Sequence, residues 1–222
     1  NGKIVSSKLL PKEIAGRDIY LPANVYIIGT VNMDETTHPF SKKVLDRANT
    51  IEFNRVQLDH LDFLKELKQV EPMKLNQEAF AAKYLYLKDV YQRYPHVVER
   101  ATNELVKINT YLQPLGAHIG YRVRDEICFY LACNEEGKLM TFENAFDHCL
   151  LQKILPRVSG SDARVQRTLE QLFTFCTGIE VNGEYDALLD FTYAKYPKSA
   201  DKILHMLRRL ADDGFTSFWI GS

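Results

Sequence analysis

The hydrophobic pattern of the chain changes its period once, near residue 54, and this change limits the folds that the chain can adopt. Before this point the sequence is rich in β-branched residues, Gly and Pro, and short apolar runs predict strands. After it, apolar residues recur at the helical spacing of about 3.6 residues. We therefore expect an α+β, mainly α, protein: residues 1–54 form part of an α/β domain, and residues 55–222 form a bundle of helices.

The first region has the order strand, polar loop, helix, strand, which is half of an α/β unit. The apolar run Val25–Val31 predicts a strand buried on both faces, because unbroken apolar runs are typical of parallel sheets. Pro39 suits the first turn of a short helix that carries Val44 and Leu45 on its apolar side. Thr50–Phe53 predicts the next strand.

The second region contains amphipathic segments separated by Gly and Pro. Two helices are predicted from apolar faces within Leu58–Leu67 and Phe80–Tyr91, and a third from the face that runs from Val97 to Leu112. Further helices are predicted at about 121–134, 142–155, 163–176, 184–195 and 199–212. We expect the aromatic tail, Phe215 to Trp219, to pack on this bundle and not to stack on nucleic-acid bases.

The charge balance and the cysteine usage exclude several classes of function. The chain has 28 Lys and Arg against 29 Asp and Glu, which argues against an extended nucleic-acid-binding surface and leaves a reader based on Arg208–Arg209 or Lys42–Lys43 weakly supported. It has neither an apolar run of roughly 18 residues nor a signal peptide, so we expect a cytoplasmic chain without membrane contact. The four cysteines predict buried, reduced thiols, and the six scattered histidines predict no metal site.

Asn32 directly follows the predicted buried strand. Ligands of open parallel sheets bind beyond the carboxyl ends of the strands, where an amide can orient a water or hold a phosphate oxygen. The carboxylates of Asp34 and Glu35 can polarise that water. The alternative is that Asn32 caps the turn after the strand.

Arg47 ends the predicted short helix. Arginine suits bidentate contact with phosphate, and an arginine delivered by a neighbouring subunit stabilises charge on a transferring phosphoryl group. The alternative is a surface ion pair with Asp46, which contributes little to stability.

Arg122 and Arg124 lie near the start of the predicted helix at 121–134. A cation at a helix N-terminus is slightly unfavourable, so an arginine kept there indicates an anionic partner. The alternative is an ion pair between Arg122 and Glu126 at i,i+4.

The stretches Asn24–Asn32 and Val44–Phe53 together resemble the second half of an AAA+ module, most of all that of the McrB-like motors of modification-dependent restriction systems. The segment Leu155–Ser161 also resembles McrB-like proteins. One departure is Thr36, where the family has an arginine. The resemblance implies the following catalytic and nucleotide-binding residues: Asn32 as sensor 1, Glu35 or Asp34 as the water-positioning acid, Arg47 as the arginine finger, and Arg122, with Arg124 second, as sensor 2.

The resemblance also implies a fold and a function. The fold is the C-terminal half of an AAA+ α/β core followed by a large helical lid. The function is GTP or ATP hydrolysis with Mg²⁺ in a hexameric ring that powers a McrC-like nuclease, with DNA bound through a domain outside this sequence.

The sequence contains no Walker A motif, GxxxxGK[ST], and no apolar strand ending in paired acids. In the family both motifs precede the part matched here, and the first residue is Asn1, so we expect a piece of a longer protein that binds and hydrolyses no nucleotide alone. The alternative function is a helical adaptor that binds a protein partner without any NTPase role.

Overall fold

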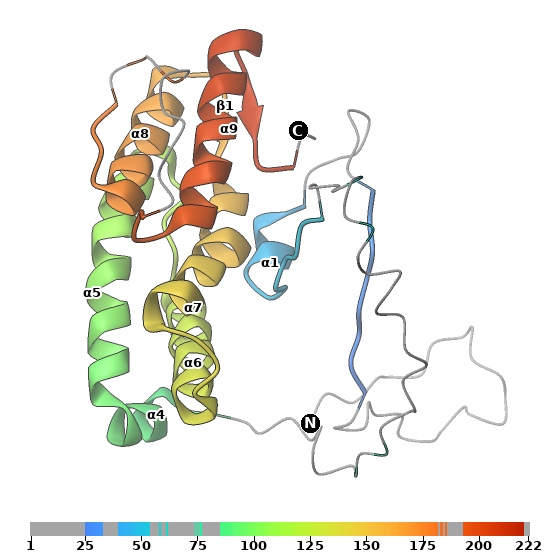
Figure 1. Cartoon of the computed structure of the whole chain (residues 1–222), viewed down its shortest axis with the longest axis vertical. Coiled ribbons are helices and arrows are strands. Elements are labelled where there is room, and N and C mark those ends of the chain that lie inside the picture. Colours follow the sequence, from blue (N-terminus) through green and yellow to red (C-terminus); the bar gives the residue numbers. More distant parts are fainter. Residues whose placement is uncertain are drawn as a thin grey trace, which may run out of the picture. The chain divides into compact units, whose positions relative to one another are not determined.

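The computed structural model describes residues 25–32, 40–53, 85–181 and 193–219, together with residues 58, 61, 74, 76, 183 and 185. The chain divides into two compact units, residues 1–31 with 57–84 and residues 32–56 with 85–222. The helices and strands below all belong to the second unit (Figure 1). The domain boundary near residue 54 stays a prediction.

In its described part the second unit is mainly α. Its elements, in chain order, are α1 (Lys42–Leu45), α4 (Leu87–Arg93), α5 (Pro95–Leu112), η1 (Gln113–Leu115), α6 (Tyr121–Gly137), α7 (Phe142–Cys149), the π-helix η2 (Leu150–Ile154), η3 (Leu155–Arg157), β1 (Ser159–Gly160), α8 (Ala163–Thr177), α9 (Pro197–Asp213) and β2 (Thr216–Ser217). The two strands form a small antiparallel sheet that pairs Ser159 with Ser217 and Gly160 with Thr216.

Local sequence signals set several of the helix ends. Pro95 and Pro197 each occupy the first position of a helix, where the missing N–H costs no hydrogen bond. The side chain of Asp162 accepts hydrogen bonds from the N–H groups of Arg164 and Val165 and so caps α8. Gly178 ends α8 in the left-handed conformation that favours glycine.

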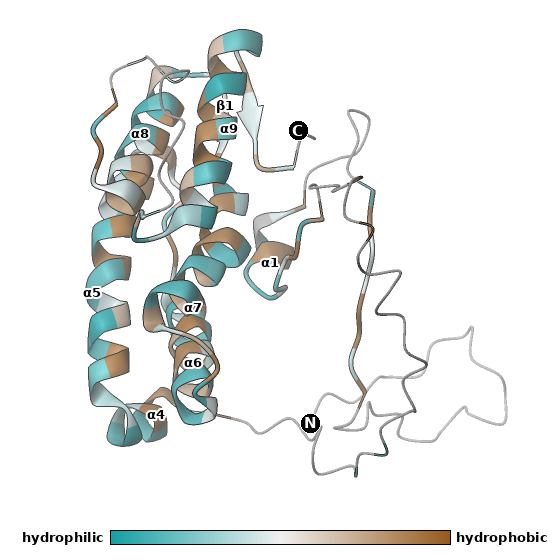
Figure 2. Ribbon diagram, in the orientation of Figure 1, coloured by the Kyte–Doolittle hydropathy of each residue, from teal (hydrophilic) through white to brown (hydrophobic). Residues whose placement is uncertain are grey.

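The long helices pack around one apolar core. α8 and α9 lie along each other, α5 packs against both α6 and α8, and α7 contacts α6 and α9. Figure 2 shows that apolar and polar residues alternate around each helix, as expected for amphipathic helices with one buried face. Burial of each large side chain contributes roughly 1.5–3 kcal/mol. The fully buried ones include Ile108, Leu131, Phe146, Phe173 and Leu207.

The helix predictions for 97–112, 121–134, 142–155, 163–176 and 199–212 are confirmed. The short helix with Leu45 on its buried side is also confirmed, whereas Val44, expected on the same side, is 45% exposed. The helix expected at 184–195 and most of those expected between residues 58 and 91 lie outside the described residues, apart from the end of the last one, which α4 confirms. The end of the aromatic tail packs on the bundle as expected, because Phe218 is part of the buried core and Trp219 packs against that core. Phe215, at the start of the tail, is 44% exposed.

The predicted strands of the first region are wrong for this structure. Residues Val25–Val31 have no strand assignment and their large side chains are exposed, Ile28 by 89%. Thr50–Phe53 is irregular as well, and Phe53 is 90% exposed. A strand buried on both faces needs neighbouring strands and covering layers, and the described residues contain no strand beside either segment.

Three of the four predicted buried thiols, Cys128, Cys149 and Cys176, are buried, whereas Cys133 is exposed. On α6 both neighbours of Cys133 in sequence, Ala132 and Asn134, are buried, but Cys133 itself lies on the outer face of the helix, so apolar neighbours do not predict its burial. None of the helices that the structure describes is both long enough and apolar enough to cross a membrane.

Candidate functional site

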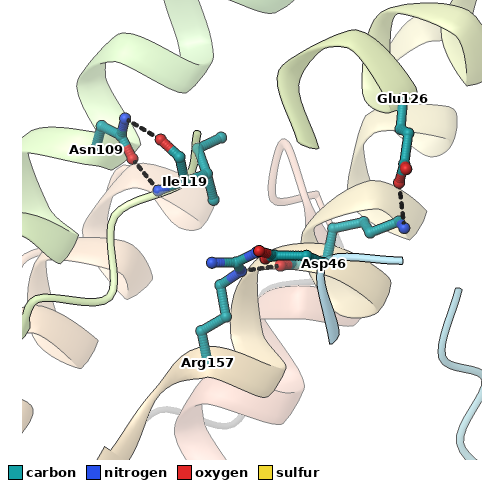
Figure 3. A network of polar contacts seen from close by, with 6 residues as sticks. Asp46, Asn109, Ile119, Glu126 and Arg157 are labelled. Atoms are coloured by element: carbon teal, nitrogen blue, oxygen red, sulfur yellow. Dashed lines mark hydrogen bonds and ion pairs between the residues drawn. The ribbon is translucent and has the colours of Figure 1, made fainter. Parts of the chain in front are cut away.

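The end of α1 is held by an ion pair between Asp46 and Arg157, which are far apart in the sequence. The carboxylate of Asp46 accepts a hydrogen bond from the guanidinium of Arg157, which lies at the end of η3 (Figure 3). The Arg157 side chain is only 5% exposed. Because an unpaired buried cation is costly, this contact fixes the end of α1 on the bundle.

Arg47 follows Asp46 and is exposed. Among the described residues Arg47 has no ion-pair partner, and the carboxylate of Asp46 is bonded to Arg157. The surface pair that the sequence offered as the alternative for Arg47 is therefore not the arrangement in this structure. An exposed guanidinium beside an anchored carboxylate is free to meet an anion outside the unit.

A second buried cation connects the same region to α6. Lys153 lies on the π-helix η2, its side chain is 4% exposed, and its Nζ donates to Oε2 of Glu126 on α6 at 2.6 Å. One turn later the Nε of Arg157 donates to the backbone carbonyl of Lys153 at 3.0 Å. Asp46, Arg157, Lys153 and Glu126 thus form a chain of contacts from α1 through η3 and η2 to α6, and we call these four residues the clamp.

The start of α6 is fixed by Asn109 on α5. Its Nδ2 donates to the carbonyl of Ile119 at 3.1 Å and its Oδ1 accepts from the Ile119 N–H at 2.8 Å (Figure 3). Gly120, at the N-cap of α6, supplies no side-chain cap. The loop before α6 is therefore held by a side chain of another helix.

Arg122 and Arg124 differ in their surroundings. Arg122 is exposed and, within the described part of the chain, has no ion-pair partner, because Glu126 is bonded to Lys153. Arg124 pairs with Asp125 at 2.6 Å, and its guanidinium lies 4.9 Å from the centre of the Tyr121 ring. Of the two arginines, Arg122 is the one available to an external anion.

Of the other predicted site residues, the structure describes only Asn32. Asn32 is exposed, and none of the clamp contacts includes it. Asp34 and Glu35 lie outside the described residues. The structure thus connects the surroundings of Arg47 and Arg122 through the clamp. The sensor-1, arginine-finger and sensor-2 assignments all stay predictions.

A further polar cluster, in which Glu104 and Tyr196 are buried and Lys195 is exposed, lies between α5 and the start of α9. Nζ of Lys195 pairs with Oε1 of Glu104 at 2.8 Å, and the same ammonium lies 4.9 Å from the centre of the Tyr196 ring. Burial, with a smaller contribution from the Glu104 carboxylate, raises the pKa of the Tyr196 hydroxyl far above its usual range. This tyrosine stays neutral at any physiological pH and serves packing.

The residues that could ligate a metal are dispersed. Within the described ranges no group of three or more His, Cys, Asp or Glu side chains could hold a metal ion. Burial also raises the pKa of the Cys128 thiol to about 11, which keeps it protonated and a poor ligand.

Sequence reasoning missed Arg157 and Lys153. The signal was the segment 153–157, in which two cations one helical turn apart stand among apolar residues. Both cations would face the core in a regular helix, so each needs an acid as partner, but the local sequence does not say which one.

One family model matches the chain, that of DUF8727, a domain of unknown function, over residues 55–215. None of the curated proteins and none of the solved structures matches it. Three clamp residues, Glu126, Lys153 and Arg157, lie within the matched range, and Asp46 precedes it. Since the match covers well over half of the sequence, the chain belongs to the DUF8727 family.

Proposed function

We propose that this chain carries the sensor-1, arginine-finger and lid segments of a McrB-like AAA+ motor that hydrolyses GTP or ATP, assembles into a ring and powers a partner nuclease against foreign DNA. The observation that carries the proposal is the exposure of Arg47 beside an Asp46 that is bonded to the buried Arg157. An arginine finger has to reach out of its own subunit, and a firmly held neighbour lets it do so at low entropic cost.

In this proposal Arg47 stabilises charge on the γ-phosphoryl group bound by the neighbouring subunit. Arg122 contacts the phosphates from the lid of its own subunit, which agrees with its exposure at the start of α6. Asn32 orients the attacking water together with Glu35 or Asp34. Arg124 is the weaker choice for sensor 2 because it is already paired with Asp125.

A helical adaptor that binds a protein partner is the second candidate. The observation that favours it is the exposure of the segment Val25–Asn32. This segment does not form the buried strand that would place Asn32 beside a bound nucleotide. An adaptor would bind neither GTP nor ATP, so nucleotide binding by the full-length protein separates the two functions.

Mixed rings of two inactive variants test the motor. Asn32→Ala removes the group that acts within a subunit, and Arg47→Ala removes the group that acts on the neighbour, so each variant alone should lose most of its hydrolysis. In an equimolar mixture about a quarter of the interfaces combine an intact sensor 1 with an intact finger, and about a quarter of the wild-type rate should return. The measurement is phosphate release from GTP and from ATP by the full-length protein.

Arg93→Ala is the matched control, because Arg93 is another exposed arginine at the end of a short helix. It should hydrolyse nucleotide at the wild-type rate. Two results would overturn the assignment: unchanged turnover in Arg47→Ala, or a mixture no more active than its two components.

A further inference from the structure

We infer that Arg157 is a positioning residue for Arg47, and that the clamp couples the end of α1 to α6. The inference rests on the proposed function for its catalytic consequence, but the mechanical part concerns this chain alone. Arg157 holds Asp46, Asp46 precedes Arg47, and Lys153 extends the same contacts to Glu126 on the helix that begins with Tyr121 and Arg122.

The first argument is the imbalance of burial within the two ion pairs. The cations are almost fully buried, Arg157 at 5% and Lys153 at 4%, whereas Asp46 and Glu126 are partly exposed, at 37% and 34%. Each cation has been removed from water, so it depends on its acid far more than the acid depends on it. One acid directly follows α1 and the other lies on α6, and displacement of either element would leave a buried charge unpaired.

The second argument is the backbone that carries the two cations. Residues Leu150–Ile154 form a π-helix that continues directly into the 3-10 helix Leu155–Arg157. π-helical turns are rare and occur frequently at functional sites, where they redirect side chains. Here the irregular turns carry both buried cations, Lys153 paired with Glu126 on α6 and Arg157 paired with Asp46 at the end of α1. The two turns are also joined to each other, because Nε of Arg157 donates to the carbonyl of Lys153.

The third argument is that the segment around α1 has further contacts before and after Asp46 in the sequence. Before it, the Phe40 ring packs edge-on against Trp219 at 5.3 Å. After it, Nζ of Lys202 pairs with Oε1 of Glu52 at 2.6 Å. The segment is thus held at three points, and the exposed Arg47 lies directly beside the middle one. Loss of the middle contact should free the end of α1 without detaching the whole segment.

Asp46→Asn tests the clamp in the full-length protein, and Asp125→Asn is the control, because Asp125 is a similarly exposed acid that pairs with the neighbouring Arg124. The first readout is the rate at which trypsin cleaves the chain after Arg47, and it needs no nucleotide. Local opening of α1 should raise this cleavage rate about tenfold in Asp46→Asn and leave it unchanged in the control. Glu126→Gln, which removes the other acid, should raise the same rate by a smaller factor.

The second readout is catalytic. Asp46→Asn should lower kcat for nucleotide hydrolysis about tenfold with little change in KM, because a mobile arginine finger stabilises the transition state less often. The double variant Asp46→Asn/Arg47→Ala should be no slower than Arg47→Ala alone, since Asp46 acts only through Arg47.

The two readouts test different parts of the inference, so each can contradict it independently of the other. Unchanged trypsin cleavage after Arg47 in Asp46→Asn, with Asp125→Asn equally unchanged, overturns the clamp whatever the protein hydrolyses. Accelerated cleavage in a protein that hydrolyses no nucleotide keeps the clamp and removes the proposed function. Accelerated cleavage with an unchanged kcat, or a double variant slower than Arg47→Ala, overturns the positioning role of Arg157.

Discussion

The carboxylate of Asp147 on α7 accepts hydrogen bonds from the backbone N–H groups of Lys198 and Ser199, both at 2.9 Å, in the first turn of α9. The Ser199 hydroxyl donates to the same carboxylate. The residue before α9, Tyr196, provides no side-chain cap. A buried acid from one helix therefore satisfies the free N–H groups of another and also meets the positive end of its dipole.

Asp147→Ala should be among the more damaging single substitutions in the bundle. It leaves the buried N–H of Ser199 and the part-buried N–H of Lys198 without an acceptor, so we expect a loss of about 3 kcal/mol in the free energy of unfolding. Asp162→Ala is the control, because Asp162 caps its own helix from an exposed position, and its loss should cost about 1 kcal/mol. Urea unfolding of both variants measures the difference; equal losses would show that burial adds nothing to the cap of α9.

At the scale of elements, the sequence predicted the helices well because a helix is a local structure. The apolar spacing from Val97 to Leu112 places those side chains on one face, and α5 buries that face. The predicted helix at 142–155 is interrupted by the π-helix Leu150–Ile154, which the periodicity does not reveal, because a single wide turn shifts the apolar face only slightly. The strands failed for the opposite reason: they depend on partners distant in sequence.

The small sheet gives a prediction for Gly160, which pairs with Thr216 at a backbone φ of +141°. A Cβ at this position would lie 2.9 Å from Cγ2 of the buried Val165 on α8. Gly160→Ala should therefore combine backbone strain with a steric clash and cost about 2–3 kcal/mol of unfolding free energy.

Gly178→Ala separates these two effects. Gly178 also has a positive φ, +76°, but a Cβ there meets no atom within 4 Å. This variant should lose only about 1 kcal/mol, from strain alone. Thermal unfolding of both proteins gives the comparison, and a Gly160 variant no less stable than the Gly178 variant would mean that α8 adjusts to the added methyl group.

At the scale of the whole molecule, the sequence predicted the core but not the site. Arg47 and Arg122 have no ion pair with Asp46 and Glu126 because other cations bind these two acids. Asp46 pairs with Arg157, 111 residues later in the chain, and Glu126 pairs with Lys153, 27 residues later. Neither separation leaves a local pattern. The family resemblance pointed to Arg47 and Arg122 by their place in the motifs. Only the fold shows that the nearby acids, Asp46 and Glu126, are paired with buried cations.

Three buried thiols make the stability of the bundle depend on pH. Burial raises the pKa of Cys128 from 9.0 to about 11, and burial likewise raises the pKa values of Cys149 and Cys176. These three thiols lie on α6, α7 and α8, so the effect is distributed over the core. Above pH 9 the unfolded chain releases protons that the native state retains, so stability is complete below this pH and falls as the pH rises toward the folded-state pKa values.

Replacement of single cysteines by alanine tests this account. At pH 7, Cys128→Ala should be about 1 kcal/mol less stable than the wild type, because it loses packing. Between pH 7 and pH 10 the wild type should lose about 1.4 kcal/mol through Cys128 alone, most of it above pH 9, and the variant does not lose it, so the deficit should close near pH 10. Cys133→Ala, at an exposed position, should run parallel to the wild type throughout. Urea unfolding from pH 7 to 10 provides the three curves; a Cys128→Ala deficit that stays constant would mean that this thiol ionises equally in the native and unfolded states, and that the core around α6 admits water.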